Sequence, residues 1–331
     1  MRHQATTCQQ QMGNLPEYRI KESPPFKHTG IDYAGPIRLK ACGSAKNTTI
    51  SGYIAIFVCM VTRAVHIEVV SSLKTDAFIS AFNRFQARRG NCTNLYSDNA
   101  GTFIGSANKL EQIHNSWTSD TTIKELSTKG IKWTFITPKA PHQGGIWEAA
   151  IKSAKHHMHR VTKSALLTFE EFTTVMAQIE ACLNSRPLYA LSDDPADQRV
   201  ITPADKIGSG PILTPLVNRE VLEKVNLTNK YRFMEGMVND FWQKWKLDYI
   251  SSLQNLHKWR KPKENLKIND MVLVIDENLA PANWSLGKIS KVYADKQGLV
   301  RKVTVKTACG NISRAVQQLV WIPVESNGGE C

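Results

Sequence analysis

YIAIFVCMVTRAVHIEVV, residues Tyr53–Val70, is the clearest extended pattern in this chain. Its two halves, Tyr53–Val61 and Ala64–Val70, are rich in β-branched and aromatic residues and are joined by a two-residue turn, which predicts a β-hairpin. The longer half is also the longest apolar run in the chain, and it is too short to cross a bilayer. We expect the hairpin to pair beside the preceding strand, which carries Asp32.

The segments after the hairpin alternate between helical and extended patterns. Lys74–Arg89 has apolar residues at helical spacing, a short strand ends at Tyr96, and another strand is expected at Ile131–Ile136. Further helices are predicted near Ala107–Asn115, Asp120–Lys129 and Phe169–Asn184. The order is three strands, then helices alternating with strands, which predicts an α/β fold with a mixed sheet and flanking helices.

The C-terminal third has a different pattern. An irregular connection rich in Asp, Pro and Gly spans about 191–216, and a long helical pattern follows at Val221–Trp259. We expect this helix to dock one domain on the other. Beyond it, a small SH3-like β-barrel is predicted from four short strands at Met271–Ile275, Lys288–Tyr293, Val300–Thr307 and Ile312–Ala315.

Two aspartates stand at strands. Asp32 lies within HTGIDYAGPI, a strand interrupted by Gly35-Pro36, and an aspartate in a half-buried strand is costly unless it is paired or binds a metal. Asp98, in TNLYSDNAGTF, follows a strand at the position where ligands bind in open α/β sheets. For Asp98 the alternative is an N-cap or Asx-turn role.

A third carboxylate, Glu148, lies in PKAPHQGGIWEAAIKSAK, residues Pro138–Lys155. The proline and two glycines before Ile146 predict a turn, after which a helix begins. On that helix Glu148, Lys152 and Lys155 share a face. The plain alternative is a surface ion pair that stabilises the helix by about 0.2–0.5 kcal/mol.

Carboxylates from two strands and a helix would supply the oxygen ligands that a hard divalent cation such as Mg²⁺ prefers. No cluster of zinc-type ligands competes for this role. The spacings, 98 − 32 = 66 and 148 − 98 = 50 residues, leave room for a complete α/β domain.

These segments resemble the integrase region of BEL/Pao-type retrotransposon polyproteins, a branch of the retroviral-integrase-like DDE transposases. The resemblance runs from about Gln11 to Pro323, and its segments are QMGNLPEYRI, FKHTGIDYAGPI, VCMVTRAVHIEVV, YSDN, APHQGGIWEAAIKSAK, LNSRPL and WRKPKENLKINDMVLV. It implies an RNase-H-like mixed-sheet core with flanking helices, a helical linker and an SH3-like β-barrel. The implied boundaries are 1–22 for a remnant of the N-terminal region, 23–190 for the catalytic core, 191–262 for the connection and linker, 263–324 for the DNA-binding barrel and 325–331 for a tail.

The resemblance also implies an activity. Asp32, Asp98 and Glu148 become the catalytic, metal-binding triad of a DDE enzyme that holds two Mg²⁺ or Mn²⁺ ions. The implied reactions are trimming of the element's DNA 3′-ends and strand transfer into target DNA. Implied DNA contacts near the triad are Lys152, Lys155, Asn99, His142 and Gln143, and those on the barrel are Lys288, Lys291, Arg301, Lys302, Lys306 and Arg314. For the basic residues, an ordinary solvated surface is the alternative, and His142 could equally be a loop residue bound only to water.

Composition supports a nucleic-acid partner without identifying it. The chain of 331 residues has a formal charge of +13 and a pI near 9.4. Its seven cysteines are scattered and include no CxxC pair, which favours reduced thiols in an intracellular protein. We expect DNA partners, a homo-oligomer, no membrane association, and nuclear localisation if the chain is active.

The beginning of the sequence departs from the family pattern. Integrases of this kind start with a His₂Cys₂ zinc domain, whereas here only Cys8 precedes QMGNLP, and His3 with Cys8 cannot complete a tetrahedral site. We therefore expect a fragment, a truncated gene model or a decayed copy. The competing hypotheses are a DNA-binding remnant without transfer activity, and an RNase-H-like nuclease. The nuclease is less favoured because RNA-cleaving relatives need a fourth acidic group and lack the PHQGGIWE loop.

Overall fold

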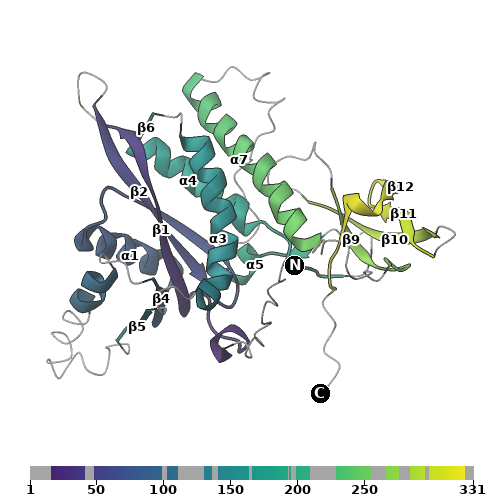
Figure 1. Ribbon diagram of the computed structural model, residues 1–331, viewed down its shortest axis with the longest axis horizontal. Helices are drawn as coiled ribbons and strands as arrows, with labels where there is room; N and C mark the ends of the chain where they lie inside the picture. The colour runs from purple at the N-terminus through teal and green to yellow at the C-terminus, as the bar shows by residue number, and fades with distance from the viewer. Residues whose placement is uncertain are drawn as a thin grey trace, which may run out of the picture.

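A computed structural model describes residues 16–41, 48–98, 103–110, 130–135, 141–163, 166–192, 194, 199–208, 229–254, 265–275, 284–294 and 298–324. In helix α3 (Pro141–Thr162), side chains are described from Lys152 onward. The helix expected at Asp120–Lys129 and the residue Asn99 lie outside these ranges. Figure 1 shows the arrangement, with a twisted sheet between helices, the long helix α7 beside it, and a small β domain at the far end of α7.

The core is a mixed sheet, as predicted, and its strand order is β3-β2-β1-β4-β5. Its strands are β1 (His28–Lys40), β2 (Thr49–Cys59), β3 (Val65–Val70), β4 (Asn94–Ser97) and β5 (Lys132–Phe135). β2 runs antiparallel to β1 and β3, whereas β4 is parallel to β1 and β5 is parallel to β4. The short strand β6 (Leu167–Thr168) pairs with the distal end of β1. The expected α/β class and RNase-H-like core are confirmed.

The expected interruption of the first strand is a local irregularity and not an end. β1 continues through the Gly35-Pro36 peptide, and its register against β2 shifts between Ala34 and Ile37. The strand is therefore long enough to pair with β4 at one end and with β6 at the other.

Alternating side chains of β2 give the sheet its two cores. Ala55, Phe57 and Cys59 face helix α1 (Thr75–Arg89), where Phe57 stacks on Phe85 with ring centroids 4.3 Å apart. The described helical residues 103–110 add Phe103 to this side. The chain is therefore helical from Phe103, four residues before the helix expected near Ala107–Asn115. Residues 111–115 lie outside the described ranges.

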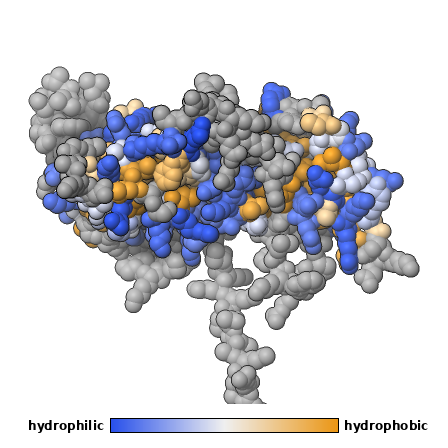
Figure 2. Space-filling view, turned by 90° about the horizontal axis from the view of Figure 1, so that it is seen from above, coloured by the Kyte–Doolittle hydropathy of each residue, from blue (hydrophilic) through white to orange (hydrophobic). Residues whose placement is uncertain are grey.

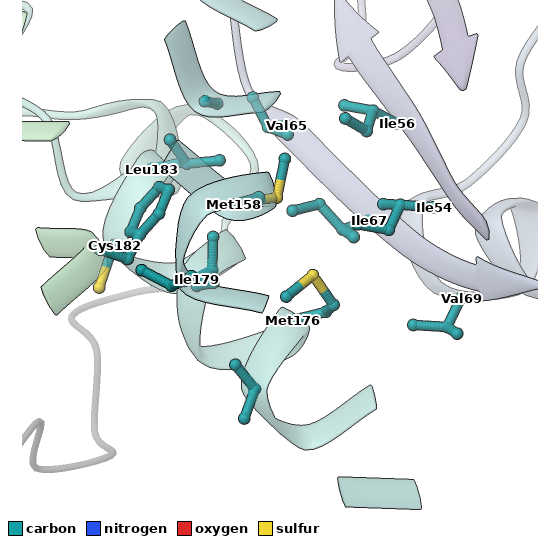
Figure 3. Packing of buried hydrophobic residues seen from close by; sticks show 14 of the residues in the cluster. Ile54, Ile56, Val65, Ile67, Val69, Met158, Met176, Ile179, Cys182 and Leu183 are labelled. Atoms are coloured by element: carbon teal, nitrogen blue, oxygen red, sulfur yellow. The ribbon is translucent and has the colours of Figure 1, made fainter. Parts of the chain in front are cut away.

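The opposite face of the sheet is covered by three helices. Ile54, Ile56 and Ile67 pack against α3, α4 (Phe169–Asn184) and α7 (Asn229–Gln254). Figure 3 shows Met158, Met176 and Ile179 pointing toward these strand side chains. α4 has the predicted bounds, and it begins with a capping box in which Thr168 and Glu171 bond each other's backbone N–H groups.

The start of α3 differs from the prediction. The helix begins at Pro141 and includes both glycines that were expected to form a turn before Ile146. Proline fits the first helical position because its fixed φ suits a helix and its missing N–H has no intrahelical acceptor there. Glycine in a helix costs about 1 kcal/mol relative to alanine, which lowers helix propensity without forbidding the helix.

Two side chains at the end of α4 fix the hairpin, although they are far from it in sequence. Asn184 binds Val65 through both sides of its amide, accepting from the backbone N–H at 2.8 Å and donating to the carbonyl at 2.7 Å. The buried guanidinium of Arg186 donates to the carbonyls of Leu183 and Arg63. The turn between β2 and β3 is thereby tied to the end of α4.

In the described part of the connection after α4, the regular elements are short. A two-stranded sheet pairs β7 (Tyr189–Ala190) with β8 (Val200–Ile201), and the short helix α5 (Pro203–Lys206) follows. Residues 209–228 lie outside the described ranges.

The C-terminal domain is an antiparallel sheet of the expected barrel type, with the order β12-β11-β10-β9-β13. Its strands are β9 (Met271–Val274), β10 (Ser285–Ala294), β11 (Val300–Thr307), β12 (Gly310–Ala315) and β13 (Leu319–Trp321). β13 was not predicted, because three residues after the 3₁₀ turn Val316–Gln318 are too short to give a period. A Cβ on Gly287 would lie 2.3 Å from Val305 Cγ1, so the close β10–β11 packing requires glycine there.

Helix α7 joins the two domains. Its Phe241, Trp242 and Trp245 belong to the core cluster of the mixed sheet. Farther along, Ile250 packs with Leu273 and Leu286 of the barrel. The helix within the expected range Val221–Trp259 therefore contacts both domains, in agreement with the expectation that it docks one on the other. No helix in the described part of the chain is long and apolar enough to span a membrane.

A buried ion network connects β3, α1 and α4. His66 Nε2 lies 3.1 Å from Glu68 Oε1, and Nδ1 lies 3.3 Å from Glu180 Oε2. Three arginines, Arg84, Arg88 and Arg89, pair with the two carboxylates. Burial lowers the pKa of His66, but hydrogen bonds to Glu180 and Glu68 outweigh burial and raise it. For Glu68, burial raises the pKa, whereas hydrogen bonds from His66 and Arg84 outweigh it and lower the pKa.

These shifts predict a pH window for stability. Because the pKa of His66 is raised, the contribution of this residue to folding stability is complete below pH 6.5, its ordinary pKa, and is lost as the pH rises through the folded-state pKa. Because the pKa of Glu68 is lowered, its contribution is complete above pH 4.5, its ordinary pKa, and is lost as the pH falls through the folded-state pKa. Both contributions are therefore complete between pH 4.5 and pH 6.5.

The His66→Gln variant should be less stable than the parent by about 1–3 kcal/mol in urea unfolding near pH 5.5, because partners of the buried ring are left unpaired.

This penalty should shrink toward about pH 8, where the parent also loses its charged histidine. The matched control is Asp76→Asn. Asp76 lies on α1, which also carries the three arginines of the network, and it forms an exposed ion pair with Lys109. Removing this pair should change stability little at either pH. An equal penalty for His66→Gln at both pH values would contradict the assignment.

Candidate catalytic and nucleic-acid site

Asp32 and Asp98 are aligned by the register of β1 and β4. Paired residues in these parallel strands are 66 positions apart, as in His28 and Asn94 (94 − 28 = 66). The two aspartates have the same separation (98 − 32 = 66). The described pairing ends at Gly30 and Tyr96, and two further residues along each chain lead to Asp32 and Asp98. Because paired strands lie about 4.8 Å apart, this alignment brings the two aspartates to one place on the sheet.

Both aspartates belong to the sheet face that carries α3. Side chains alternate along a strand, so Asp32 shares its face with Ala34, and Asp98 is in step with Tyr96. Ala34 and Tyr96 both pack in the cluster formed with α3, α4 and α7. Their intervening neighbours Ile31 and Leu95 pack on the α1 side.

The Asp32 carboxylate has a fixed position. Its Oδ1 accepts the backbone N–H of Tyr33 at 2.7 Å, and its Oδ2 forms an ion pair with the Lys155 ammonium of α3. Both side chains are largely buried, at 29% exposed for Asp32 and 23% for Lys155. Lys155, which the resemblance assigns to DNA, therefore contacts a triad residue in this structure.

The backbone at Asp98 is held from β5. Trp133 donates its indole N–H to Ser97 Oγ at 2.9 Å, and Ser97 Oγ donates to the Asp98 carbonyl, also at 2.9 Å. Ser97 is fully buried, whereas the Asp98 side chain is exposed at the end of β4. Sequence reasoning did not assign a role to Ser97, although it stands beside Asp98 in the YSDN segment.

The third predicted triad residue, Glu148, lies in α3, seven residues before Lys155. Seven residues make two helical turns, or about 10 Å along the axis, and bring Glu148 back to the face that carries Lys155. The side chains of His142, Gln143 and Glu148 lie outside those described, as does Asn99 entirely. Lys152 is exposed. Among the described side chains, no three His, Cys, Asp or Glu residues form a group that could hold a metal ion.

Helix α3 is also held from its other side by α7. Asp248 Oδ2 accepts from Ser153 Oγ at 3.2 Å and lies 2.7 Å from His157 Nε2. Ser153 and His157 are four residues apart and so share a face of α3. Sequence reasoning missed this contact, because His157 and Asp248 are 91 positions apart and no pattern in the sequence links them.

The barrel brings four of the six predicted basic contacts together on one face. Lys288 is opposite Lys306, and Tyr293 is opposite Lys302 in the β10–β11 register, while Lys291 is opposite Thr304. The side chains of Val303 and Val305, which alternate with these, point into the barrel core. We call the outward set Lys288, Lys291, Tyr293, Lys302, Thr304 and Lys306 the β10–β11 face.

The exposed side chain of Tyr293 contacts three other residues of the β10–β11 face. The ammonium groups of Lys291 and Lys302 lie 5.2 and 5.7 Å from the Tyr293 ring centroid, within cation–π range. The Tyr293 hydroxyl is 3.2 Å from Thr304 Oγ1, and this hydrogen bond together with the two lysines lowers the tyrosine pKa. Figure 2 shows hydrophilic residues over much of the barrel end of the molecule.

Arg301 and Arg314 do not belong to that face. Arg314 is opposite Val303 in the β11–β12 register and is in step with Ile312, which packs against the barrel core. Arg301 lies where the β10–β11 register shifts, since Tyr293 pairs with Lys302 and Ala294 pairs with Val300, so it is the extra residue of a bulge and not one of the paired positions of the face. The strand register therefore sets these two arginines apart from the four lysines.

A model of a family of unknown function, DUF5641, matches residues 229–322. This range begins at the first residue of α7 and ends one residue after β13, so it covers the linker helix together with the barrel. No curated protein matches the chain.

Solved structures similar to this chain include integrases of three viruses. The HTLV-2 integrase catalytic core domain in complex with magnesium is 14% identical, with a TM-score of 0.33, over 51% of this chain and 91% of that one. The BIV integrase catalytic core is 15% identical, with a TM-score of 0.34, over 56% of this chain and 95% of that one. A simian T-cell lymphotropic virus intasome in complex with the PP2A regulatory subunit B56 gamma is 11% identical, with a TM-score of 0.35, over 95% of this chain and 85% of that one.

The Asp248 contacts predict a measurable cost. Asp248→Ala removes two hydrogen bonds and leaves the buried His157 ring without that partner, so it should destabilise the protein by about 1–2 kcal/mol in urea unfolding. Asp240→Ala, an exposed aspartate on the same helix, is the matched control and should have little effect. Equal stability of the two variants would mean that Asp248 does not hold α3.

Proposed function

We propose that this chain is a BEL/Pao-type integrase: a divalent-cation-dependent polynucleotidyl transferase that trims the 3′-ends of element DNA and joins them to target DNA. The observation that carries the proposal is the shared 66-residue offset, which aligns Asp32 with Asp98 on the sheet face that carries α3. The helix that bears Glu148 contacts Asp32 directly through Lys155. Two strands and one helix would thus supply the three carboxylates.

The donor chemistry of this site fits a hard cation. The three proposed ligands are carboxylates, which Mg²⁺ and Mn²⁺ prefer. Asp32, Asp98 and Glu148 would hold the two ions. When bound, two such ions activate an attacking oxygen and stabilise a leaving oxygen in an in-line phosphoryl displacement.

The protein's own residues would position the reacting groups. The Tyr33 N–H fixes the Asp32 carboxylate, and the hydrogen-bond chain from Trp133 through Ser97 fixes the backbone at Asp98. Asp248 holds α3 through Ser153 and His157. Placement matters for this chemistry, since reacting atoms must approach within about 3–3.5 Å in line.

The proposed substrate is DNA, both the element's ends and a target duplex. The net charge of +13 and the four lysines of the β10–β11 face favour binding to phosphates without reading bases. We further propose that the protein acts as a homo-oligomer that holds two DNA ends, and that it works in the nucleus.

A second candidate function is DNA binding without strand transfer. The β10–β11 face favours it, because this face lies on a separate domain and does not depend on the carboxylates. The two candidates differ in whether joined DNA products depend on the triad.

Strand transfer tests the triad. With short duplexes that mimic element ends and with Mg²⁺ or Mn²⁺, the parent should give joined products on a sequencing gel. Asp98→Asn and Glu148→Gln should reduce them by at least about 10³-fold, because each removes a ligand charge while keeping the side-chain shape. Duplex binding, measured by fluorescence anisotropy, should stay within about threefold of the parent, because phosphate contacts supply most of the affinity.

Full joining activity in either variant would refute the triad. Salt-sensitive DNA binding without joined products from the parent, and again after an upstream zinc-binding domain is added, would favour the second candidate.

The β10–β11 face predicts a selective loss of DNA binding. Lys288→Ala with Lys306→Ala should weaken binding and reduce the slope of log K against log salt by about 1.8, or about 0.9 per lost phosphate contact. Stability should not fall, because the substitutions remove like charges that stand opposite each other. Arg301→Ala with Arg314→Ala is the matched control, which removes the same charge from elsewhere on the barrel. Equal slopes for the two double variants would contradict a role for this face.

A further inference from the structure

The ion pair between Asp32 and Lys155 leaves the Asp32 carboxylate without a free oxygen. Oδ1 accepts the Tyr33 N–H at 2.7 Å, and Oδ2 is paired with the Lys155 ammonium. With about a quarter of each side chain exposed, water screens the pair only in part. Lys155 therefore occupies the one oxygen that the backbone does not.

A divalent cation at Asp32 and the Lys155 ammonium would compete for Oδ2. Two positive charges a few ångströms apart repel each other strongly in a partly buried site, and the doubly charged ion gains more from the carboxylate. Lys155 has a flexible four-carbon stem, so its ammonium can move while α3 stays in place. The helix itself is held independently by Asp248.

We propose that Lys155 is an internal counter-ion of Asp32 that is exchanged for the divalent cation, and that the released ammonium then binds a phosphate of the DNA. This inference rests on the cation site of the proposed function. Without the cation, the ammonium neutralises a carboxylate that is costly to leave unpaired. With the cation, the same ammonium is freed on the face of α3 that also carries Glu148.

The exchange links cation binding to DNA binding. Since the cation releases Lys155 for phosphate, each ligand should increase the affinity for the other by the same factor. Lys163 is exposed directly after the end of α3, eight residues from Lys155, so its ammonium should be equally available with and without the cation. Lys155 and Lys163 thus form a matched pair for comparison.

Amine labelling of the full chain tests the exchange directly. An N-hydroxysuccinimide acetate reagent would be added with and without Mg²⁺ or Mn²⁺, and acetylation of each lysine would be measured by mass spectrometry of peptides. We expect Lys155 to be labelled at least about threefold faster with the cation, since the ion pair that protects it has been broken. Lys163 should be labelled at the same rate in both conditions.

Calorimetric titration of Mn²⁺ provides a second measurement that does not depend on enzyme activity. Lys155→Met removes the competing ammonium and should tighten Mn²⁺ binding by about fivefold. Lys163→Met, which removes the same charge from an exposed position outside the proposed site, should change the affinity less than twofold. Asp32→Asn should abolish the binding.

The outcomes separate the exchange from the proposed function. Mn²⁺ binding that depends on Asp32 but leaves Lys155 labelling and the Lys155→Met affinity unchanged would overturn the exchange and keep the cation site. Equal tightening by Lys155→Met and Lys163→Met would also overturn it, because the effect would then be one of general charge. No Mn²⁺ binding by the parent would overturn the cation site and the exchange with it.

Discussion

The parallel alignment of β1 with β4 governs the geometry of the proposed catalytic site. Its 66-residue offset puts Asp32 and Asp98 side by side, and the alternation of side chains turns both toward α3. A slip of one residue in either strand would turn one aspartate toward the phenylalanine-rich cluster under α1, where a charge is costly. The two hydrophobic layers that hold the register thus also hold the carboxylates in place.

Helix α3 is held between two carboxylates on opposite sides. Asp32 of the sheet pairs with Lys155, and Asp248 of α7 binds Ser153 and His157. Because α7 also packs on the barrel through Ile250, one helix contacts both the helix of the proposed active site and the domain of the proposed DNA contacts. A displacement of the barrel that moved α7 would therefore act on the position of α3.

The barrel has a buried apolar core, but its β10–β11 face places like charges next to each other. Val303 and Val305 fill its core, while Lys288 and Lys306 stand opposite each other on the outside, an arrangement that costs stability in an antiparallel pair. Tyr293 offsets part of this repulsion by cation–π contacts with two lysines. A polyanion bound to this face would remove the remaining repulsion.

Local patterns in the sequence were sufficient for most elements, because periodicity and capping act within a few residues. They predicted the β2–β3 hairpin, α1, the bounds of α4 and four strands of the barrel, and they identified Asp32 and Asp98 as unusual. They failed at the glycines that α3 includes, because glycine lowers helix propensity without ending a helix. Contacts between distant residues, such as Lys155 with Asp32 and His157 with Asp248, follow from strand register and helix docking, which no spacing in one sequence encodes.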